Sequence, residues 1–422
     1  MVRKVRVLGL LAVLALATAA FGCGGKPAAK QETPAQAGQS GAQQKAAPAQ
    51  PSGGQAAAPA AAGATIKLGG IFDLTGGTGD VGTPYSEGVR DYVDFVNTKG
   101  GVNGRKIDLV WQDYAYKVPQ AVDLYKKLVT QDKVVAIYGW GTGDTEAMKE
   151  LIAKDKIPYV SGSLSENLRD PSKTPYNFLV AATYSDQARM ALKWIAQQKP
   201  GAKVGFVYND TPFGKSPLGD AREYAQKLGL NWVGEVVVAL NATEAATQML
   251  ELQKKGAEYA LIQETTNATV VTLKEAKKLG LKTQFIGLNW AADEGVVKNA
   301  GEAAEGYIGV IPFAFPYETD RPGMKEIQEY LSAKGKKLEE KTQKYVQGWV
   351  SAKVIVDAIA QVKGEVTGES IKAALESFRN HDLGGLAAPV TFTDKDHAGA
   401  KTTRLYQVKN GRFEPLAEMS LD

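Results

Sequence analysis

The chain has 422 residues, of which 23% are charged, and a formal net charge of only +4 at pH 7. Because no long basic run accompanies this weak charge, neither nucleic acid nor an acidic surface is implied as a partner. The single cysteine excludes an internal disulfide, so the fold must depend on its hydrophobic core.

The first 23 residues have the pattern of a secretion leader. A basic start precedes Val7–Ala20, an apolar run that is too short to cross a bilayer but has the length of a signal-peptide core. The small residues before Cys23 resemble a bacterial lipoprotein processing site. We therefore predict a leader over residues 1–23 with lipid attachment at Cys23. The alternative is an ordinary secretory peptide in which this cysteine is incidental.

Residues 24–64 are predicted to form a flexible tether. Gly24–Gly63 consists almost wholly of Ala, Gly, Pro, Gln, Ser and Lys, so it cannot bury enough apolar surface to fold. Treated as a coil of about 40 residues, it has a mean reach of roughly 35 Å, which would let an anchored domain meet a membrane partner. No later run in the sequence is long enough to cross a membrane.

From Thr65 onward, short apolar runs alternate with amphipathic segments, which is the pattern of parallel sheets built from βαβ units. This body is longer than one core usually covers, and its rhythm restarts near residue 200, so two doubly wound lobes are expected. Strands are predicted at Ile66–Phe72, Lys106–Gln112, Val134–Tyr138, Lys156–Ser161, Asn177–Ala182, Lys203–Tyr208, Trp232–Ala239, Glu258–Gln263 and Thr283–Leu288. Helices are predicted at Tyr85–Lys99, Pro119–Gln131, Thr145–Lys154, Gln187–Gln198, Gly219–Leu228, Glu244–Lys254 and Thr269–Leu279.

The last part of the body is expected to return to the first lobe through a strand at Tyr307–Phe313. The elements predicted after it are helices at Gly323–Lys334, Thr342–Val362 and Glu369–Phe378, and strands at Val390–Thr393 and Thr403–Val408.

Two neighbouring predicted strands both end in small, polar loops. Gly139–Asp144 follows the strand at Val134–Tyr138, and Gly162–Ser165 follows the strand at Lys156–Ser161. In open α/β sheets the carboxyl edge of the strands is where ligands bind. Free backbone N–H groups and hydroxyls there can hold a small anionic or polar molecule without any chemistry.

Several segments resemble the leucine/isoleucine/valine-binding proteins of ABC importers. The matching segments are Lys67–Gly76 (KLGGIFDLTG), Asn97–Asp113 (NTKGGVNGRKIDLVWQD), Gln120–Val135 (QAVDLYKKLVTQDKVV), Lys203–Gly214 (KVGFVYNDTPFG) and Ala300–Val310 (AGEAAEGYIGV). The resemblance implies an α/β fold of the type I periplasmic-binding kind, with two parallel-sheet lobes joined by three crossovers and a ligand enclosed between them. It places residues 65–184 with 315–388 in the N-terminal lobe and residues 185–314 with 389–422 in the C-terminal lobe.

The resemblance also implies which residues hold the ligand. In that family two first-lobe loops grip an amino acid's carboxylate and ammonium, and they match Gly141, Thr142, Gly143 and Asp144 and then Ser163, Leu164 and Ser165. Phe213 stands where the family often has a tyrosine facing the ligand. For Thr142 and Asp144 the alternative role is helix capping.

The second-lobe wall departs from the family pattern. Asn289 replaces the acidic residue that pairs with the ligand's ammonium, and a neutral amide cannot supply that charge in a closed cleft. Glu264, Asp293 or Asp144 is expected to replace it, or the ligand carries no ammonium. Aromatic residues near the predicted cleft suit a flat or hydrophobic ligand, although each alone is more often core packing; they are Tyr114, Tyr116, Trp140 and Trp290.

No catalytic constellation, metal motif or cofactor fingerprint is recognisable, so no cofactor or metal is expected. The sequence thus predicts an extracytoplasmic, lipid-anchored receptor that delivers a branched-chain or hydrophobic amino acid to an ABC permease with its ATPase subunits. Three alternatives are a receptor of the same fold for an aromatic or branched acid or an amide, a ligand sensor for a signalling partner, and a hydrolase or dehydrogenase on an α/β scaffold.

Overall fold

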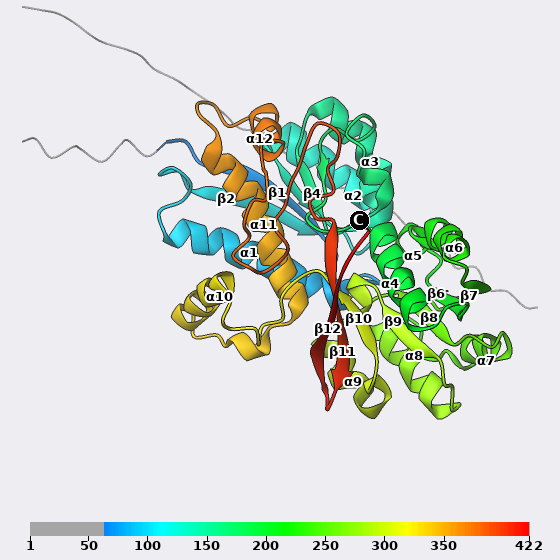
Figure 1. Ribbon diagram of the computed structural model, residues 1–422. Helices are drawn as coiled ribbons and strands as arrows, with labels where there is room; N and C mark the ends of the chain where they lie inside the picture. The colour runs from blue at the N-terminus through cyan, green and yellow to red at the C-terminus, as the bar shows by residue number, and fades with distance from the viewer. Residues whose placement is uncertain (1–62, 422) are drawn as a thin grey trace, which may run out of the picture. The chain divides into compact units, whose positions relative to one another are not determined.

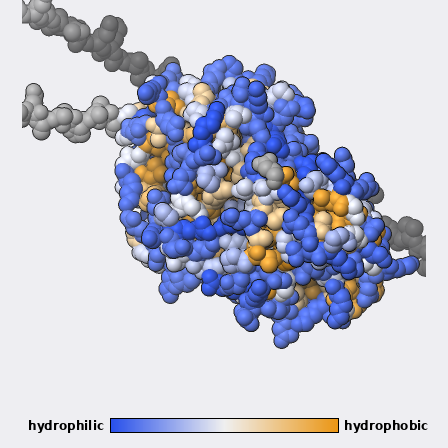
Figure 2. Space-filling view, viewed as in Figure 1, coloured by the Kyte–Doolittle hydropathy of each residue, from blue (hydrophilic) through white to orange (hydrophobic). Residues whose placement is uncertain are grey.

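The computed structural model describes residues 63–421 (Figure 1). The predicted leader, Cys23 and nearly all of the predicted tether therefore lie outside the described residues. Most of the face seen in Figure 2 is hydrophilic, and the large hydrophobic residues exposed within the described range are Val237 and Leu250. The apolar side chains are gathered instead in cores around two separate sheets.

The first sheet has five parallel strands in the order β2-β1-β3-β4-β5. They are β1 (Ile66–Phe72), β2 (Ile107–Asp113), β3 (Ile137–Gly139), β4 (Tyr159–Ser161) and β5 (Asn177–Phe178). Its helices are α1 (Gly79–Thr98), α2 (Val118–Lys127), α3 (Thr142–Asp155), α10 (Pro322–Ala333), α11 (Gln343–Gln361) and α12 (Gly368–Leu375). Helix α1 packs on α11 and α2 packs on α3, which is the doubly wound arrangement that right-handed crossovers produce.

The second sheet has seven strands in the order β12-β11-β10-β9-β8-β6-β7. They are β6 (Lys203–Tyr208), β7 (Asn231–Val237), β8 (Tyr259–Gln263), β9 (Gln284–Gly287), β10 (Ile308–Ile311), β11 (Thr402–Lys409) and β12 (Arg412–Ser420). Its helices are α4 (Tyr184–Gln198), α5 (Pro212–Lys215), α6 (Leu218–Lys227), α7 (Ala246–Lys254), α8 (Thr266–Lys278) and α9 (Glu294–Ala300). Strands β6 to β10 are parallel, whereas β11 and β12 form an antiparallel hairpin at the edge.

The predicted fold class is confirmed: two doubly wound lobes are built on the two sheets. The chain passes between them three times, between β5 and α4, after β10, and before β11. Because of these crossings, each lobe contains segments that are far apart in the sequence (Figure 1).

Two predicted details of the last part of the body are wrong, and one strand is missing from the prediction. Strand β10 belongs to the second sheet, where it pairs with β9, and the chain returns to the first lobe only after it. The segment 390–393 is not a strand but makes isolated bridges, while Val390 and Phe392 fill the first-lobe core. Strand β12 was not predicted, because Pro415 interrupts its pattern; a proline is tolerated there because β12 is an edge strand.

The start of α1 also differs from the prediction. The helix begins at Gly79 rather than at Tyr85, and it contains Pro84. The Asp73 carboxylate organises the preceding turn by accepting hydrogen bonds from the N–H groups of Gly76 and Thr78. This turn brings the first residues of α1 to the carboxyl edge of β1.

Two glycines allow α1 and α11 to pack in backbone contact. A Cβ atom on Gly88 would lie 2.0 Å from the Tyr345 carbonyl oxygen, and one on Gly348 would lie 1.9 Å from the Tyr85 carbonyl oxygen. Any side chain at either position therefore forces the helices apart.

We predict that Gly88→Ala and Gly348→Ala each lower the free energy of unfolding by about 1–3 kcal/mol, because overpacking moves backbone rather than a flexible side chain. Urea denaturation measures this effect. The matched control is Gly219→Ala in α6, where a Cβ meets nothing within 4 Å. That change should stabilise the protein by up to about 1 kcal/mol, because alanine favours a helix over glycine. Equal stability of all three variants would contradict the proposed role of the close contact.

Candidate functional site

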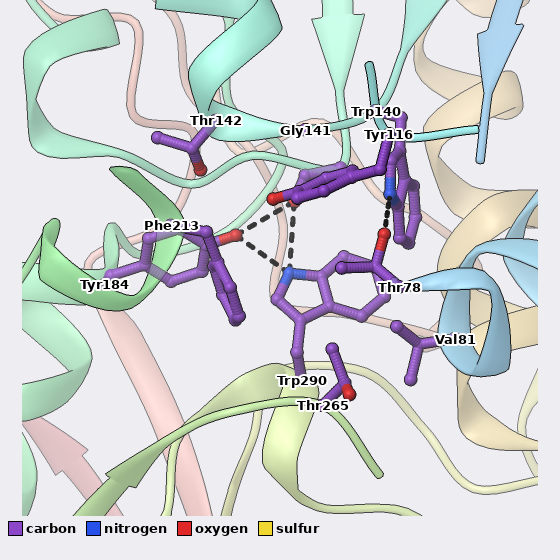
Figure 3. Close-up of a pocket in the computed structure, with 11 residues that line it drawn as sticks. Thr78, Val81, Tyr116, Trp140, Gly141, Thr142, Tyr184, Phe213, Thr265 and Trp290 are labelled. Carbon is purple, nitrogen blue, oxygen red and sulfur yellow. Dashed lines mark hydrogen bonds between the residues drawn. The ribbon is translucent and has the colours of Figure 1, made fainter. Parts of the chain in front are cut away.

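A cavity lies between the two lobes at the carboxyl edges of both sheets. Eleven residues line it (Figure 3), and all of them are uncharged. The first lobe and its crossover contribute Thr78, Val81, Tyr116, Trp140, Gly141, Thr142, Gly162 and Tyr184, and the second lobe contributes Phe213, Thr265 and Trp290. About 20 Å³ of this space is open to the centre of a water-sized sphere, which is room for one or two water molecules. A larger ligand therefore requires the lobes to open or the side chains to move.

Aromatic rings fill most of the space between the lobes. The Trp140 and Trp290 rings meet edge to face with their centroids 4.8 Å apart, and Tyr184 meets Phe213 at 5.5 Å. The polar tips of these rings have partners: Trp140 Nε1 donates to Thr78 Oγ1 at 2.8 Å, and Trp290 Nε1 donates to the Tyr184 hydroxyl at 2.8 Å (Figure 3). The cavity thus offers apolar faces and a few fixed dipoles.

The first-lobe wall contains the start of a helix. Gly141 is the N-cap of α3 and Thr142 its first residue, so the partly unsatisfied N–H groups of the first turn lie at the cavity. Thr142 Oγ1 is 2.8 Å from Ser163 Oγ, which joins the loop after β3 to the loop after β4. This end of the cavity is suited to an anionic or strongly polar group.

Four of the residues predicted to bind the ligand line the cavity: Gly141, Thr142, Phe213 and Trp290. The other predicted residues lie behind this lining. Gly143 faces Pro212 across the cleft, and Leu164 is fully buried in the first-lobe core. Ser165 caps the short helix Glu166–Leu168 and donates to Glu146 at 2.6 Å.

Asn289 is not among the residues that line the cavity, and its Oδ1 has no hydrogen-bond partner within the described residues. Its Nδ2 donates to Gln347 Oε1 of α11 at 3.1 Å, and its backbone N–H donates to Gln187 Oε1 of α4 at 3.0 Å. Glu264 is also buried behind the lining, where its Oε2 accepts from Asn209 Nδ2 at 3.0 Å. The positions implied by the family pattern therefore differ in how close they come to the cavity.

Several lining residues were absent from the predicted set, although the wider strand-end pattern indicates some of them. Thr78 and Val81 follow β1, and Gly162 opens a loop that was already noted as polar. Tyr184 begins α4 immediately after a crossover, where no strand-end pattern exists to identify it. Its position depends on how the two lobes meet.

The lobes are closed on each other by direct contacts around the cavity. The N–H of Asn267 donates to Asp80 Oδ2 at 2.8 Å, and Ser216 Oγ lies 3.1 Å from Ser165 Oγ. Trp290 Nε1 also reaches the Gly162 carbonyl oxygen at 3.2 Å. These contacts join second-lobe loops to first-lobe loops on several sides of the cavity.

A buried lysine ties α11 to the loop that carries Trp290. Lys344 Nζ donates to the carbonyl oxygens of Asn289 and Ala292 and to Gln343 Oε1, and it lies 5.3 Å from the centroid of the Trp290 ring. Burial lowers the pKa of this ammonium to about 8, although nearby acidic groups oppose the shift. A side chain of the first lobe thus holds the second-lobe wall of the cavity in place.

Asp144 is an unusual acidic group just behind the Gly141 wall. It is 1% exposed, its Oδ1 accepts from the Tyr114 hydroxyl at 2.7 Å, and its Oδ2 has no partner within the described residues. Burial raises the pKa of its carboxyl to about 7, against the opposing effect of the Tyr114 hydrogen bond. The carboxyl is therefore substantially protonated at neutral pH.

Residues 63–421 contain no cluster of three or more His, Cys, Asp or Glu side chains suited to a metal ion. Within the same residues, no helix is long and apolar enough to span a bilayer.

Two doubly wound lobes that close on a small cavity define a receptor that encloses a solute rather than a protein that binds at an open surface. The model of the family described as "Periplasmic binding protein" matches residues 65–412. The chain belongs to this family, which consists of extracytoplasmic ligand-binding proteins and is not an enzyme family.

Individual relatives agree with this assignment. Leu/Ile/Val-binding protein homolog 7 of Brucella suis is 26% identical over 334 residues, which cover 75% of this chain and 82% of the relative. A branched chain amino acid ABC transporter protein from Thermus thermophilus, solved with bound valine, has a TM-score of 0.81 at 29% identity and covers 84% of this chain and 96% of its own. A fatty acid ABC transporter substrate-binding protein from Thermomonospora curvata has a TM-score of 0.75 at 26% identity, with 84% and 92% covered.

Asp144→Asn should change how stability depends on pH. The carboxyl titrates near 4 in an unfolded chain but near 7 in the folded protein, so between these values only the folded state holds the proton. Stability therefore falls as pH rises through this window and levels off above it. The wild type should lose roughly 2–4 kcal/mol from this group between pH 4 and 8, a loss that the Asn variant lacks.

Urea denaturation at pH 5, 7 and 8 tests this, and the stability advantage of the Asn variant should grow with pH. Asp170→Asn is the control: hydrogen bonds from Ser172 lower the pKa of that carboxyl, so it is ionised in both states above about pH 5 and its removal should change stability by the same amount at all three pH values. Parallel pH curves for wild type and Asp144→Asn would show that this group does not titrate as described.

Proposed function

We propose that this protein is the solute-binding component of an ABC importer and captures a small amino acid of the branched-chain or hydrophobic type between its lobes. The observation that carries the proposal is the cavity between the lobes, with a helix start at one wall and aromatic rings on the others. The relatives from Brucella and Thermus, a Leu/Ile/Val-binding protein homolog and a branched chain amino acid ABC transporter protein, support the ligand class and the ABC importer. The partners are then a permease and its ATPase subunits.

The ligand's carboxylate is proposed to bind at Gly141 and Thr142. Backbone N–H groups at a helix start favour an anion, and the Thr142 hydroxyl adds a donor beside them. The apolar side chain of the ligand would then lie against Trp140, Trp290 and Phe213, which present ring faces without charge. Nothing in this binding mode alters a covalent bond, so the solute is proposed to be released unchanged.

A second candidate ligand is a carboxylic acid without an amine. The uncharged lining favours it, because no ionised side chain reaches the cavity surface to pair with an ammonium. The fatty acid receptor from Thermomonospora curvata among the structural relatives also supports it. Direct titration with both ligand types distinguishes the two candidates.

Thr142→Val should weaken binding of leucine, isoleucine or valine by about 10- to 150-fold, because the ligand's carboxylate loses a charge-assisted hydrogen bond. Isothermal titration calorimetry measures the change. In the wild type, ligand at 100 times its dissociation constant should add about 2.7 kcal/mol to stability. The control is Thr272→Val in α8, whose buried hydroxyl donates to its own helix at Ala268. If Thr142→Val binds as tightly as wild type, the carboxylate does not lie at this wall.

Lipid attachment at Cys23 is proposed to hold the receptor at the outer side of the membrane. Wild-type protein should then fractionate with membranes, and Cys23→Ser should be released into the soluble fraction, because acyl chains supply the membrane affinity. Mass spectrometry of the mature N-terminus checks the modification directly. Wild-type protein that is soluble and begins at another residue would overturn the proposal.

A further inference from the structure

The cavity poses an electrostatic problem for an amino acid ligand. An ammonium group enclosed between the lobes needs a negative charge, because its desolvation in a neutral site is costly. All eleven lining residues are uncharged, and Asn289 directs its amide to Gln347 instead. The compensating carboxylate must therefore lie just behind the lining.

Most of the buried acidic groups near the cavity are already engaged or on the wrong side. Both oxygens of Asp293 accept hydrogen bonds, from the Val296 N–H at 3.0 Å and from Thr266 Oγ1 at 2.7 Å. Glu294 Oε2 accepts from the N–H of Gln343 in α11 and its Oε1 has no partner among residues 63–421, but the positive charge of Lys344 already favours its ionised form. Asp144 lies in the first lobe beside Gly141, at the end of the cavity that suits the ligand's carboxylate.

Glu264 is the remaining buried acidic group, and its position suits contact with the ligand's ammonium group. It follows β8 directly, at the cleft edge of the second sheet, and the next residue, Thr265, lines the cavity. Its side chain is fully buried; Oε2 accepts from Asn209, whereas Oε1 has no hydrogen-bond partner within the described residues. No Lys, Arg or His among residues 63–421 forms an ion pair with it. A buried carboxylate with a free oxygen and no counter-charge is unfavourable unless a cation joins it.

A second acidic group faces Glu264 from the other lobe. Asp80 is the second residue of α1, next to the lining residue Val81; its Oδ2 accepts from the N–H of Asn267, and its charge disfavours ionisation of Glu264. Burial and Asp80 together hold the pKa of Glu264 well above its usual range, and burial likewise raises the pKa of Asp80. The contact between the lobes thus brings two acidic groups near each other.

We propose that Glu264 is the counter-ion for the ligand's ammonium group and that Asp80 adds negative charge from the opposite lobe. This inference rests on the proposed function, since it concerns how an amino acid is held in the same cavity. It assigns the ligand as a zwitterion, with its carboxylate at the start of α3 and its ammonium toward the end of β8. Glu264 is then a specificity-determining residue that distinguishes an amino acid from the corresponding acid.

Pairing of Glu264 with an ammonium group changes how many protons the protein holds, which can be measured. Burial raises the pKa of the Glu264 carboxyl above its usual range, and an ammonium beside it favours the ionised form. Binding therefore releases a proton, and affinity for an amino acid rises with pH while Glu264 would otherwise hold its proton. Asp80 is the titratable group that acts on Glu264 from the other lobe. Asn209, which follows β6, is the neutral hydrogen-bond partner of Glu264.

The test compares valine with 3-methylbutanoate, which has the same carbon skeleton without the amine. Calorimetry is done on wild type and Glu264→Gln, in two buffers of different ionisation enthalpy. Glu264→Gln should weaken valine binding by about 10- to 150-fold, leave 3-methylbutanoate binding unchanged, and abolish proton release. Glu294→Gln is the matched control, because it neutralises another glutamate of the same lobe whose pKa is raised by burial, and it should change neither affinity.

The melting temperature of each variant checks that it folds. Glu264→Asp gives a second test, because it keeps the charge but shortens the side chain by one methylene. Its valine affinity should lie between those of wild type and Glu264→Gln. If wild type binds valine and Glu264→Gln binds it equally well, the inference is wrong while the proposed function stands. Preference of wild type for 3-methylbutanoate also overturns it. If wild type binds neither ligand, the ligand class in the proposed function is wrong as well.

Discussion

The hydrogen bonds of the Lys344 ammonium hold the second-lobe wall of the cavity in place. This buried group belongs to α11 of the first lobe, yet it donates to carbonyl oxygens of the loop that carries Asn289 and Trp290 in the second. The same helix supplies Gln347, which fixes the Asn289 amide. Because the Trp290 ring lies over this cation and forms one side of the cavity, the shape of the cavity depends on a contact between lobes.

That dependence explains what the sequence could and could not predict. Alternating apolar runs indicated both sheets, and the small polar loops after β3 and β4 pointed to the wall that contains Gly141 and Thr142. These features are local, so strand-end rules suffice for them. The strand β12 and the irregular segment around Val390 were missed or misassigned because edge pairing and core filling are decided by distant partners.

The second-lobe wall was harder to predict for the same reason. The resemblance located Asn289 at a position that pairs with an ammonium in the family, but its side-chain direction is set by Gln347, which is 58 residues away. Tyr184 follows a crossover and reaches the cavity only because the lobes close there. Sequence patterns identify which loops meet at the cleft, whereas the arrangement of the lobes decides which atoms of those loops face it.

The nearly filled cavity has a consequence for solute affinity. The Trp140 and Trp290 rings pack with their centroids 4.8 Å apart and leave about 20 Å³ open, so an amino acid enters only when the rings separate. The free energy of that aromatic contact is then subtracted from the affinity of any solute that displaces it. Ring packing and solute affinity are therefore opposed, and a substitution that weakens the contact between the rings would tighten binding.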